Sequence, residues 1–214
     1  MVKIERFACN MLAENCFILS DETKECVIID CGAFREEEGK AIVNYIKKED
    51  LKPVHLLATH GHLDHHFGDN TIFTEYGLKP EVHEGDRVFM ENPYNAATTL
   101  FGITLDYELP EANFCIENTS IINFGSHTLK VIATPGHSGG SVCYYCENEH
   151  LLFTGDTLFR RSIGRTDLPG GSMFQMVSSL RLLAQLPDET VVYAGHGENS
   201  TIGYEVAHNL YMDR

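Results

Sequence analysis

The chain has 214 residues, 43% of them hydrophobic, which suits one sizeable core, so we expect a single domain over residues 1–214. Its formal charge of −15, from 31 acidic against 16 basic residues, argues against a nucleic-acid partner, which requires clustered Lys and Arg. No apolar stretch approaches the roughly 18 residues of a membrane span, and residues 1–6 lack a signal-peptide layout. Seven cysteines without paired spacing favour a reducing compartment. We therefore expect a cytoplasmic protein with no membrane partner.

The N-terminal part of the chain places β-forming residues between polar breaks. Three such runs predict an opening β-meander, at residues 3–9, 16–19 and 25–31. Apolar residues at helical spacing then predict a helix over 34–49, and a further apolar run follows at 54–58. This order indicates a strand-helix-strand unit after the meander.

Directly after the run 54–58, three histidines and one aspartate fall within six consecutive positions. His60 and His62 are two residues apart, so in an extended stretch both side chains leave the same face and can converge on one ion. Asp64 and His65 are adjacent, so they diverge and are better placed to bind a second ion. The spacing therefore suggests a two-metal site rather than a polar turn with chance histidines.

The middle of the chain is less regular. We predict a helix over 64–76, a short strand over 79–83 and a short helix over 85–91. We predict a loop near the mouth of a pocket at residues 92–109 and hairpin-rich sheet at residues 116–149.

Cys143 and Cys146 have the spacing of a redox pair. They lie in the strand-like run 141–146, where positions three apart face opposite sides of a sheet. We therefore interpret both as core residues.

The last third of the chain contains two predicted helices. One covers 173–186, with Ser172 as its N-cap and Pro187 beyond its end, and the other covers 201–212. Because strands in both halves of the chain are interrupted by helices, the pattern favours sheets covered by helices.

Four short apolar runs each lead into a metal-ligand residue: 54–58 into His60, 129–133 through residues 134–136 into His137, 151–155 into Asp156, and 191–195 into His196. Such runs predict buried strands, and strands that lie side by side end at the same edge of a sheet. Loops on one rim converge in space although they are distant in sequence. We therefore expect the ligands to gather at one edge of the sheets.

This ordered pattern resembles the metallo-β-lactamase superfamily and spans most of the chain. The resemblance implies an α/β (α+β) fold, a four-layer αββα sandwich with a two-metal site between loops at one edge of the paired sheets. It further implies a division of the ligands, with Asp156 bridging, the first metal on His60, His62 and His137, and the second on Asp64, His65 and His196. This division agrees with the one suggested by the spacing.

Within the superfamily, the chain is most similar to short glyoxalase II-like hydrolases, which resemble hydroxyacylglutathione hydrolase without its separate C-terminal glutathione-binding helical domain. Residues 160–172 and 195–205 carry this similarity. Asp156 stands where the commonest zinc β-lactamases have cysteine, and their pattern lacks His65, so both residues disfavour a lactamase. Gly139 and Leu210 stand where proline is usual in this group, and the basic residues that bind glutathione have no counterpart, so glutathione recognition stays open.

The ligand set predicts a hydrolase that uses two divalent metal ions. A metal ion lowers the pKa of bound water from about 15.7 to roughly 7, and the resulting metal-bound hydroxide can attack a carbonyl that the ions polarise. A thiolate leaves without strong acid help, which favours a thioester (S-lactoylglutathione-like) or related small ester as substrate. Asp64 is the candidate catalytic residue, because it could orient or accept the proton of that hydroxide. Zinc is the first choice of metal, with iron or manganese as alternatives.

Several other polar residues could act near the metals. Arg160 and Arg165 are candidate substrate residues for an anionic group, although an internal arginine–aspartate pair that stabilises the Gly-rich loop is the favoured interpretation. Asp30 either orients a histidine or is a simple turn carboxylate. His66 and His83 could line the pocket.

Three classes of function follow from these observations. The first is the hydrolase acting on a small-molecule thioester. The second is an oxidoreductase similar to persulfide dioxygenase, which shares the fold and the ligand residues but uses a single iron. The third is a non-enzymatic metal-binding protein, which the complete ligand set disfavours. The sequence does not predict the oligomeric state.

Overall fold

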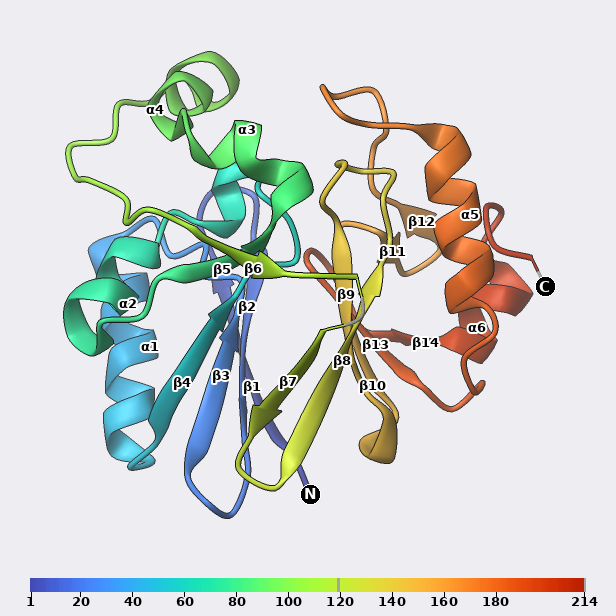
Figure 1. The fold of residues 1–214 in the computed structure, drawn as a ribbon, viewed down its shortest axis with the longest axis horizontal. Helices are drawn as coiled ribbons and strands as arrows, with labels where there is room; N and C mark the ends of the chain where they lie inside the picture. The colour runs from blue at the N-terminus through green and yellow to red at the C-terminus, as the bar shows by residue number, and fades with distance from the viewer. Residues whose placement is uncertain (119, 214) are drawn as a thin grey trace.

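The computed structural model describes residues 1–118 and 120–213. Thr119, in the predicted hairpin-rich region, and Arg214, at the end of the expected domain, lie outside the described residues. Within those ranges, two six-stranded sheets pack face to face and helices cover the outer face of each sheet (Figure 1). This confirms the predicted four-layer α/β sandwich.

The first sheet comes from the N-terminal half of the chain. Its strands, in spatial order, are β1 (Lys3–Cys9), β2 (Glu14–Ser20), β3 (Glu25–Ile29), β4 (Lys52–Leu57), β5 (Pro80–His83) and β6 (Asn113–Ile116). Antiparallel pairing joins β1, β2 and β3, which confirms the predicted meander. Parallel pairing joins β3, β4, β5 and β6.

The second sheet comes from the C-terminal half. Its strands, in spatial order, are β14 (Ser200–Thr201), β13 (Val191–Ala194), β10 (Leu151–Gly155), β9 (Val142–Cys146), β8 (His127–Ala133) and β7 (Ile121–Phe124). Only β10 and β13 pair in parallel among the described strands of this sheet. A small separate hairpin is formed by β11 (Leu158–Phe159) and β12 (Ser162–Ile163).

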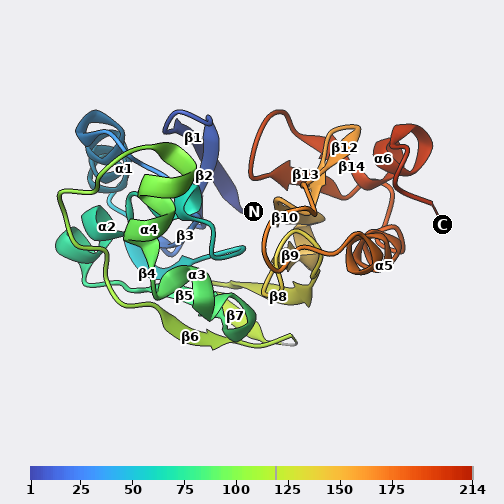
Figure 2. The same ribbon diagram turned by 90° about the horizontal axis from the view of Figure 1, so that it is seen from above.

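The view from above shows one helical layer on each side of the paired sheets (Figure 2). The α-helices are α1 (Glu36–Lys48), α2 (Asp69–Tyr76), α3 (Arg87–Met90), α4 (Pro93–Ala96), α5 (Met173–Leu183) and α6 (Ile202–His208). The other helical turns are η1 (Leu63–His65), η2 (Glu84–Asp86), η3 (Ala97–Phe101) and η4 (Glu147–Glu149). None of the helices in the described part of the chain is both long and apolar enough to cross a membrane.

Side-chain alternation explains why both faces of each sheet are buried. Along β2, Phe17 and Leu19 pack between the two sheets, whereas Cys16 and Ile18 pack with residues of α1 and α2. The second sheet follows the same rule, with Tyr144 of β9 between the sheets.

The two cysteines with redox-like spacing follow this alternation. Cys143 packs toward α5 and α6, and Cys146 packs between the sheets. Both are free thiols on opposite faces of β9, which confirms their interpretation as core residues.

Two predicted helices and one predicted loop differ from the structure. The helix expected over 64–76 begins only at Asp69, because tertiary hydrogen bonds, from Cys31 N to His65 O and from Gly68 N to Cys31 O, hold the preceding turn. The expected loop 92–109 contains α4 and η3. The helix expected over 201–212 ends at His208, where Asn209 takes an extended backbone and donates its side-chain amide to Ser162 O. By contrast, Ser172 caps α5 as predicted.

Asp21, directly after β2, links the two sheets through hydrogen bonds of its carboxylate. Its Oδ1 accepts hydrogen bonds from the backbone N (2.9 Å) and Oγ1 (2.6 Å) of Thr23. Its Oδ2 accepts from the backbone N (2.7 Å) and Oγ (2.8 Å) of Ser126, in the β7–β8 turn of the other sheet, and from Nδ1 of His127 (2.9 Å), which begins β8. Burial raises the pKa of the Asp21 carboxyl, but these donors outweigh it and hold the pKa well below its usual range.

Asp21→Asn should destabilise the fold by about 1–3 kcal/mol at neutral pH, because donors around the carboxylate lose a charged acceptor. A depressed folded-state pKa contributes stability that is present above the unfolded-state pKa of about 3.9 and is lost as the pH falls further. The Tm difference between wild type and variant, followed by circular dichroism, should therefore shrink below about pH 4. A difference that stays constant from pH 7 to pH 3 would contradict this role.

Candidate metal centre

All seven predicted ligands lie at one edge of the sandwich, where β4, β10 and β13 end. Four come from the segment between β4 and α2, and the others follow β8, β10 and β13. The side chains that the structure brings together are His60, His62, Asp64, His65, His137, Asp156 and His196. We call this set the ligand cluster.

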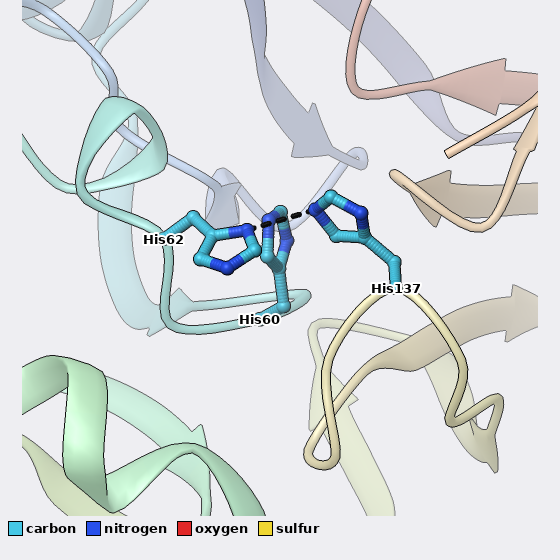
Figure 3. Close-up of side chains that lie close together, drawn as sticks. All are labelled: His60, His62 and His137. Carbon is cyan, nitrogen blue, oxygen red and sulfur yellow. Dashed lines mark hydrogen bonds between the residues drawn. The ribbon is translucent and has the colours of Figure 1, made fainter. Parts of the chain in front are cut away.

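Three histidines form the first group of the ligand cluster. One ring nitrogen from each of His60, His62 and His137 lies within 4.8 Å of the other two. Nδ1 of His62 is 2.8 Å from Nε2 of His137, and the ring of His60 lies between them in the close-up (Figure 3). His60 and His137 are buried, and His62 is half-buried, so the group opens to solvent on one side.

Asp64, His65 and His196 form the second group. Oδ2 of Asp64 is 3.3 Å from Nε2 of His196 and 3.7 Å from Nε2 of His65. His65 and Asp64 are buried, whereas the His196 side chain is 22% exposed. The spacing predicted that Asp64 and His65 lie apart from the first group, and the resemblance implied that His196 joins them.

Asp156 lies between the two groups. Its Oδ1 is 3.5 Å from Nε2 of His65 and 3.7 Å from Nε2 of His196, while its Oδ2 is 3.6 Å from Nε2 of His137. Each carboxylate oxygen therefore faces a different group. Gly195 makes this approach possible, because a Cβ at this position would come within 2.5 Å of Asp156 Oδ1.

In four of the histidines, one ring nitrogen bonds a protein acceptor and the other points into the cluster. Nδ1 of His65 donates to Asp30 (3.0 Å), Nδ1 of His137 to the Arg165 carbonyl (2.8 Å), and Nδ1 of His196 to the Leu12 carbonyl (3.1 Å). Nδ1 of His60 lies 3.1 Å from Oγ1 of Thr59. These bonds fix the ring orientation and the tautomer, as partners of metal-bound imidazoles do.

Buried polar atoms without partners show that the cluster suits cations. Nε2 of His60, Nε2 of His65 and Oδ1 of Asp156 are buried and have no hydrogen-bond partner among the described residues. Buried polar groups are otherwise nearly always paired. Imidazole and carboxylate ligands without thiolate suit zinc, iron and manganese. The ligand cluster therefore fits a binuclear metal site.

The protonation states of the first group also favour metal binding. Burial lowers the pKa of His60 well below its usual value and, with the nearby His137, lowers the pKa of His62 to about 4. Both rings are therefore neutral at pH 7, which is the form that binds a cation. Burial would also lower the pKa of His65, but Asp64 and Asp30 raise it well above its usual value.

Asp30, whose role the sequence left open, holds histidines of both groups. Its Oδ2 accepts hydrogen bonds from Nδ1 of His65 (3.0 Å) and Oγ1 of Thr59 (2.8 Å), and its Oδ1 accepts from the backbone N of Thr59 (2.7 Å). Through Thr59 it also orients His60. Asp30 adopts the left-handed region, with φ of 51°, which is costly for a non-glycine residue.

Glu14 and Asn15 also reach the site, although no motif in the sequence predicts it. Glu14 is buried, its Oε1 lies 3.9 Å from Nδ1 of His65, and burial raises its pKa well above the usual value. Nδ2 of Asn15 donates to the carbonyls of Ala194 (2.9 Å) and Gly197 (3.1 Å), which flank His196. Both residues begin β2, so only the folded sheet brings them to the ligands.

The two candidate substrate arginines are paired with carboxylates. Arg165 forms a bidentate pair with Asp167, with Nε–Oδ1 and Nη2–Oδ2 distances of 2.8 and 2.7 Å. This is the internal pair that the sequence favoured. Arg160 bonds Glu198 at 3.0 Å and lies over the ring of Tyr204.

A pocket of about 520 Å³ lies beside the ligand-bearing loop, where Phe89 lines it and packs against the ring of His62. Gly61, Leu63 and His66 line it, alternating along the chain with ligands that face the cluster. Tyr94, from the region expected near a pocket mouth, also lines it. His83 instead bonds Asn118 at 2.9 Å.

Comparison with known proteins decides the family. Residues 10–196 match the metallo-β-lactamase superfamily. The chain belongs to this superfamily. The match contains all seven residues of the ligand cluster, and the fold is the metallo-β-lactamase fold.

Three similar members of the superfamily are informative. A hydroxyacylglutathione hydrolase, GloC of Haemophilus influenzae, is 32% identical over 215 residues, which cover 99% of both chains. The structure of BLEG-1, described as a B3 metallo-β-lactamase, aligns with a TM-score of 0.85 and 33% identity over 98% of this chain and 99% of that one. TTHA1623, solved in a di-iron-bound form, aligns with a TM-score of 0.83 and 30% identity over 97% of this chain and all of that one.

Asp30→Asn should weaken the binding of both metals about 10- to 100-fold, because the amide cannot accept from Thr59 and His65 as the carboxylate does. Titration of the metal-free protein against a chromophoric chelator measures both affinities. Asp213→Asn, which changes an exposed aspartate paired with Arg181, is the control and should bind as wild type does. Unchanged affinities in Asp30→Asn would show that Asp30 is only a turn residue.

Proposed function

We propose that this member of the superfamily is a metal-dependent hydrolase that cleaves a small thioester, similar to S-lactoylglutathione, with two metal ions at the ligand cluster. The observation that carries the proposal is the place of Asp156, whose two oxygens face the two ligand groups at 3.5–3.7 Å. Similarity to GloC along 99% of both chains supports the substrate class.

The proposed ligands divide as the geometry groups them. His60, His62 and His137 would hold the first ion, and Asp64, His65 and His196 the second. When bound, the two ions would lower the pKa of a shared water molecule and polarise the substrate carbonyl. Zinc, iron and manganese all suit these ligands, and TTHA1623 is a relative with two irons.

The protein itself supplies orientation and charge. Asp64 lies next to the proposed bridging position and would orient the attacking water or accept its proton. The nearby histidines outweigh burial and keep the pKa of Asp64 well below its usual range, so it is a carboxylate at neutral pH. The leaving thiolate needs no proton from an acid, which suits a site where Asp64 is a carboxylate.

Substrate preference tests the proposal directly. Protein purified without added metal should contain two equivalents of zinc, iron or manganese, and should release thiol from S-lactoylglutathione or from a thioester of an uncharged thiol. A chain that holds one iron and consumes oxygen with glutathione persulfide would instead be a dioxygenase. Hydrolysis of nitrocefin without thioester hydrolysis would make it a lactamase, the activity named for BLEG-1.

Asp156→Asn should lose metal from both groups and lower turnover at least about 100-fold, because it removes the charge that the two ions share. Elemental analysis and thiol release measure the two effects. Near-normal rates in this variant would refute the bridging role.

A further inference from the structure

Asp86 links the two loops that carry the first ligand group. The residue is buried in η2, after β5. Its Oδ2 accepts hydrogen bonds from the backbone N of Gly61 (2.8 Å) and Oγ of Ser138 (2.6 Å), and its Oδ1 accepts from the backbone N of Gly140 (2.7 Å). Gly61 separates His60 from His62, and Ser138 directly follows His137. One carboxylate therefore joins a loop of each sheet beside the ligands.

The two loops are packed tightly around this carboxylate. A Cβ added at Gly140 would come within 2.7 Å of Cγ of Asp86, and one added at Gly61 within 2.9 Å of its Cβ. The backbone N–H groups of both glycines point at carboxylate oxygens. If the loops moved away from Asp86, these buried donors would lose their acceptor, which costs free energy.

We propose that Asp86 is a positioning residue for the first metal, acting through the two loops rather than on any ligand ring. His137 comes from the second sheet, whereas His60 and His62 come from the first, so a contact must hold the sheets in register at this edge. Asp86 provides it. The inference rests on the proposed two-metal assignment.

The second group depends on other contacts. His65 is held by Asp30, and His196 by the carbonyl of Leu12. Asp86 takes part in neither of these bonds. Its loss should therefore weaken the first metal selectively, whereas loss of Asp30, which bonds His65 directly and reaches His60 through Thr59, should weaken both.

Asp86→Asn is the most conservative test. An amide offers one oxygen where the loops present two N–H groups and a hydroxyl, so its NH2 must face an N–H donor. We expect wild type to bind two zinc ions, and the variant to bind one with unchanged affinity and the other about 10- to 100-fold more weakly. Competition with a chromophoric chelator measures both affinities. In the background of His137→Ala, Asp86→Asn should have little further effect on metal affinity.

Asp21→Asn is the matched control. Asp21 is also a buried carboxylate that bonds donors from the other sheet, but it lies at the opposite end of β2 from Glu14 and the ligands. This variant should lower the Tm and leave both zinc affinities unchanged. If Asp86→Asn does not fold, Ser138→Ala, which removes one of the three donors, should weaken only the first metal and by a smaller factor.

The outcomes separate this inference from the proposed function. If Asp86→Asn (or Ser138→Ala, where that variant is used) binds both zinc ions as tightly as wild type does, the positioning role is overturned and the proposed function still stands. Equal weakening of both metals would show a structural role only. A wild-type chain that binds no zinc, iron or manganese would overturn the proposed function and this inference with it.

Discussion

The structure depends on keeping five imidazoles and two carboxylates together at the edge of two packed sheets. Nε2 of His60, Nε2 of His65 and Oδ1 of Asp156 are buried without partners, which costs free energy unless a cation binds them. The rest of the fold makes this arrangement possible. Strands β4, β10 and β13 end at the same edge, and the hydrophobic layers between and outside the sheets fix where those ends lie.

Buried carboxylates outside the ligand cluster then set its geometry. Asp30 orients a histidine of each group, and Asp86 holds the loops that carry the first group. Asp21 performs the same kind of linkage between the sheets away from the site. An acidic chain thus uses part of its negative charge as hydrogen-bond acceptors for backbone and side-chain donors, a use that the net charge alone does not reveal.

Local sequence patterns predicted sheets covered by helices and the gathering of the ligands at one edge, and the family resemblance implied the four-layer sandwich. Alternation along β2 and β9 determines which side chains face the other sheet, and the spacing of His60, His62, Asp64 and His65 determines how they divide. Asp86 could not be predicted, because its partners lie 25, 52 and 54 residues away along the chain and are backbone amides and a serine without a motif. The start of α2 was missed for a similar reason, since Cys31 supplies the hydrogen bonds that hold the preceding turn.

The central claim is that two cations occupy the ligand cluster on either side of Asp156. Anomalous diffraction from crystals of the metal-loaded protein, collected at the absorption edge of the bound metal, tests this most directly. The account predicts two peaks, one among His60, His62 and His137 and one among Asp64, His65 and His196, both within bonding distance of Asp156. A single peak, or peaks away from these side chains, would contradict it.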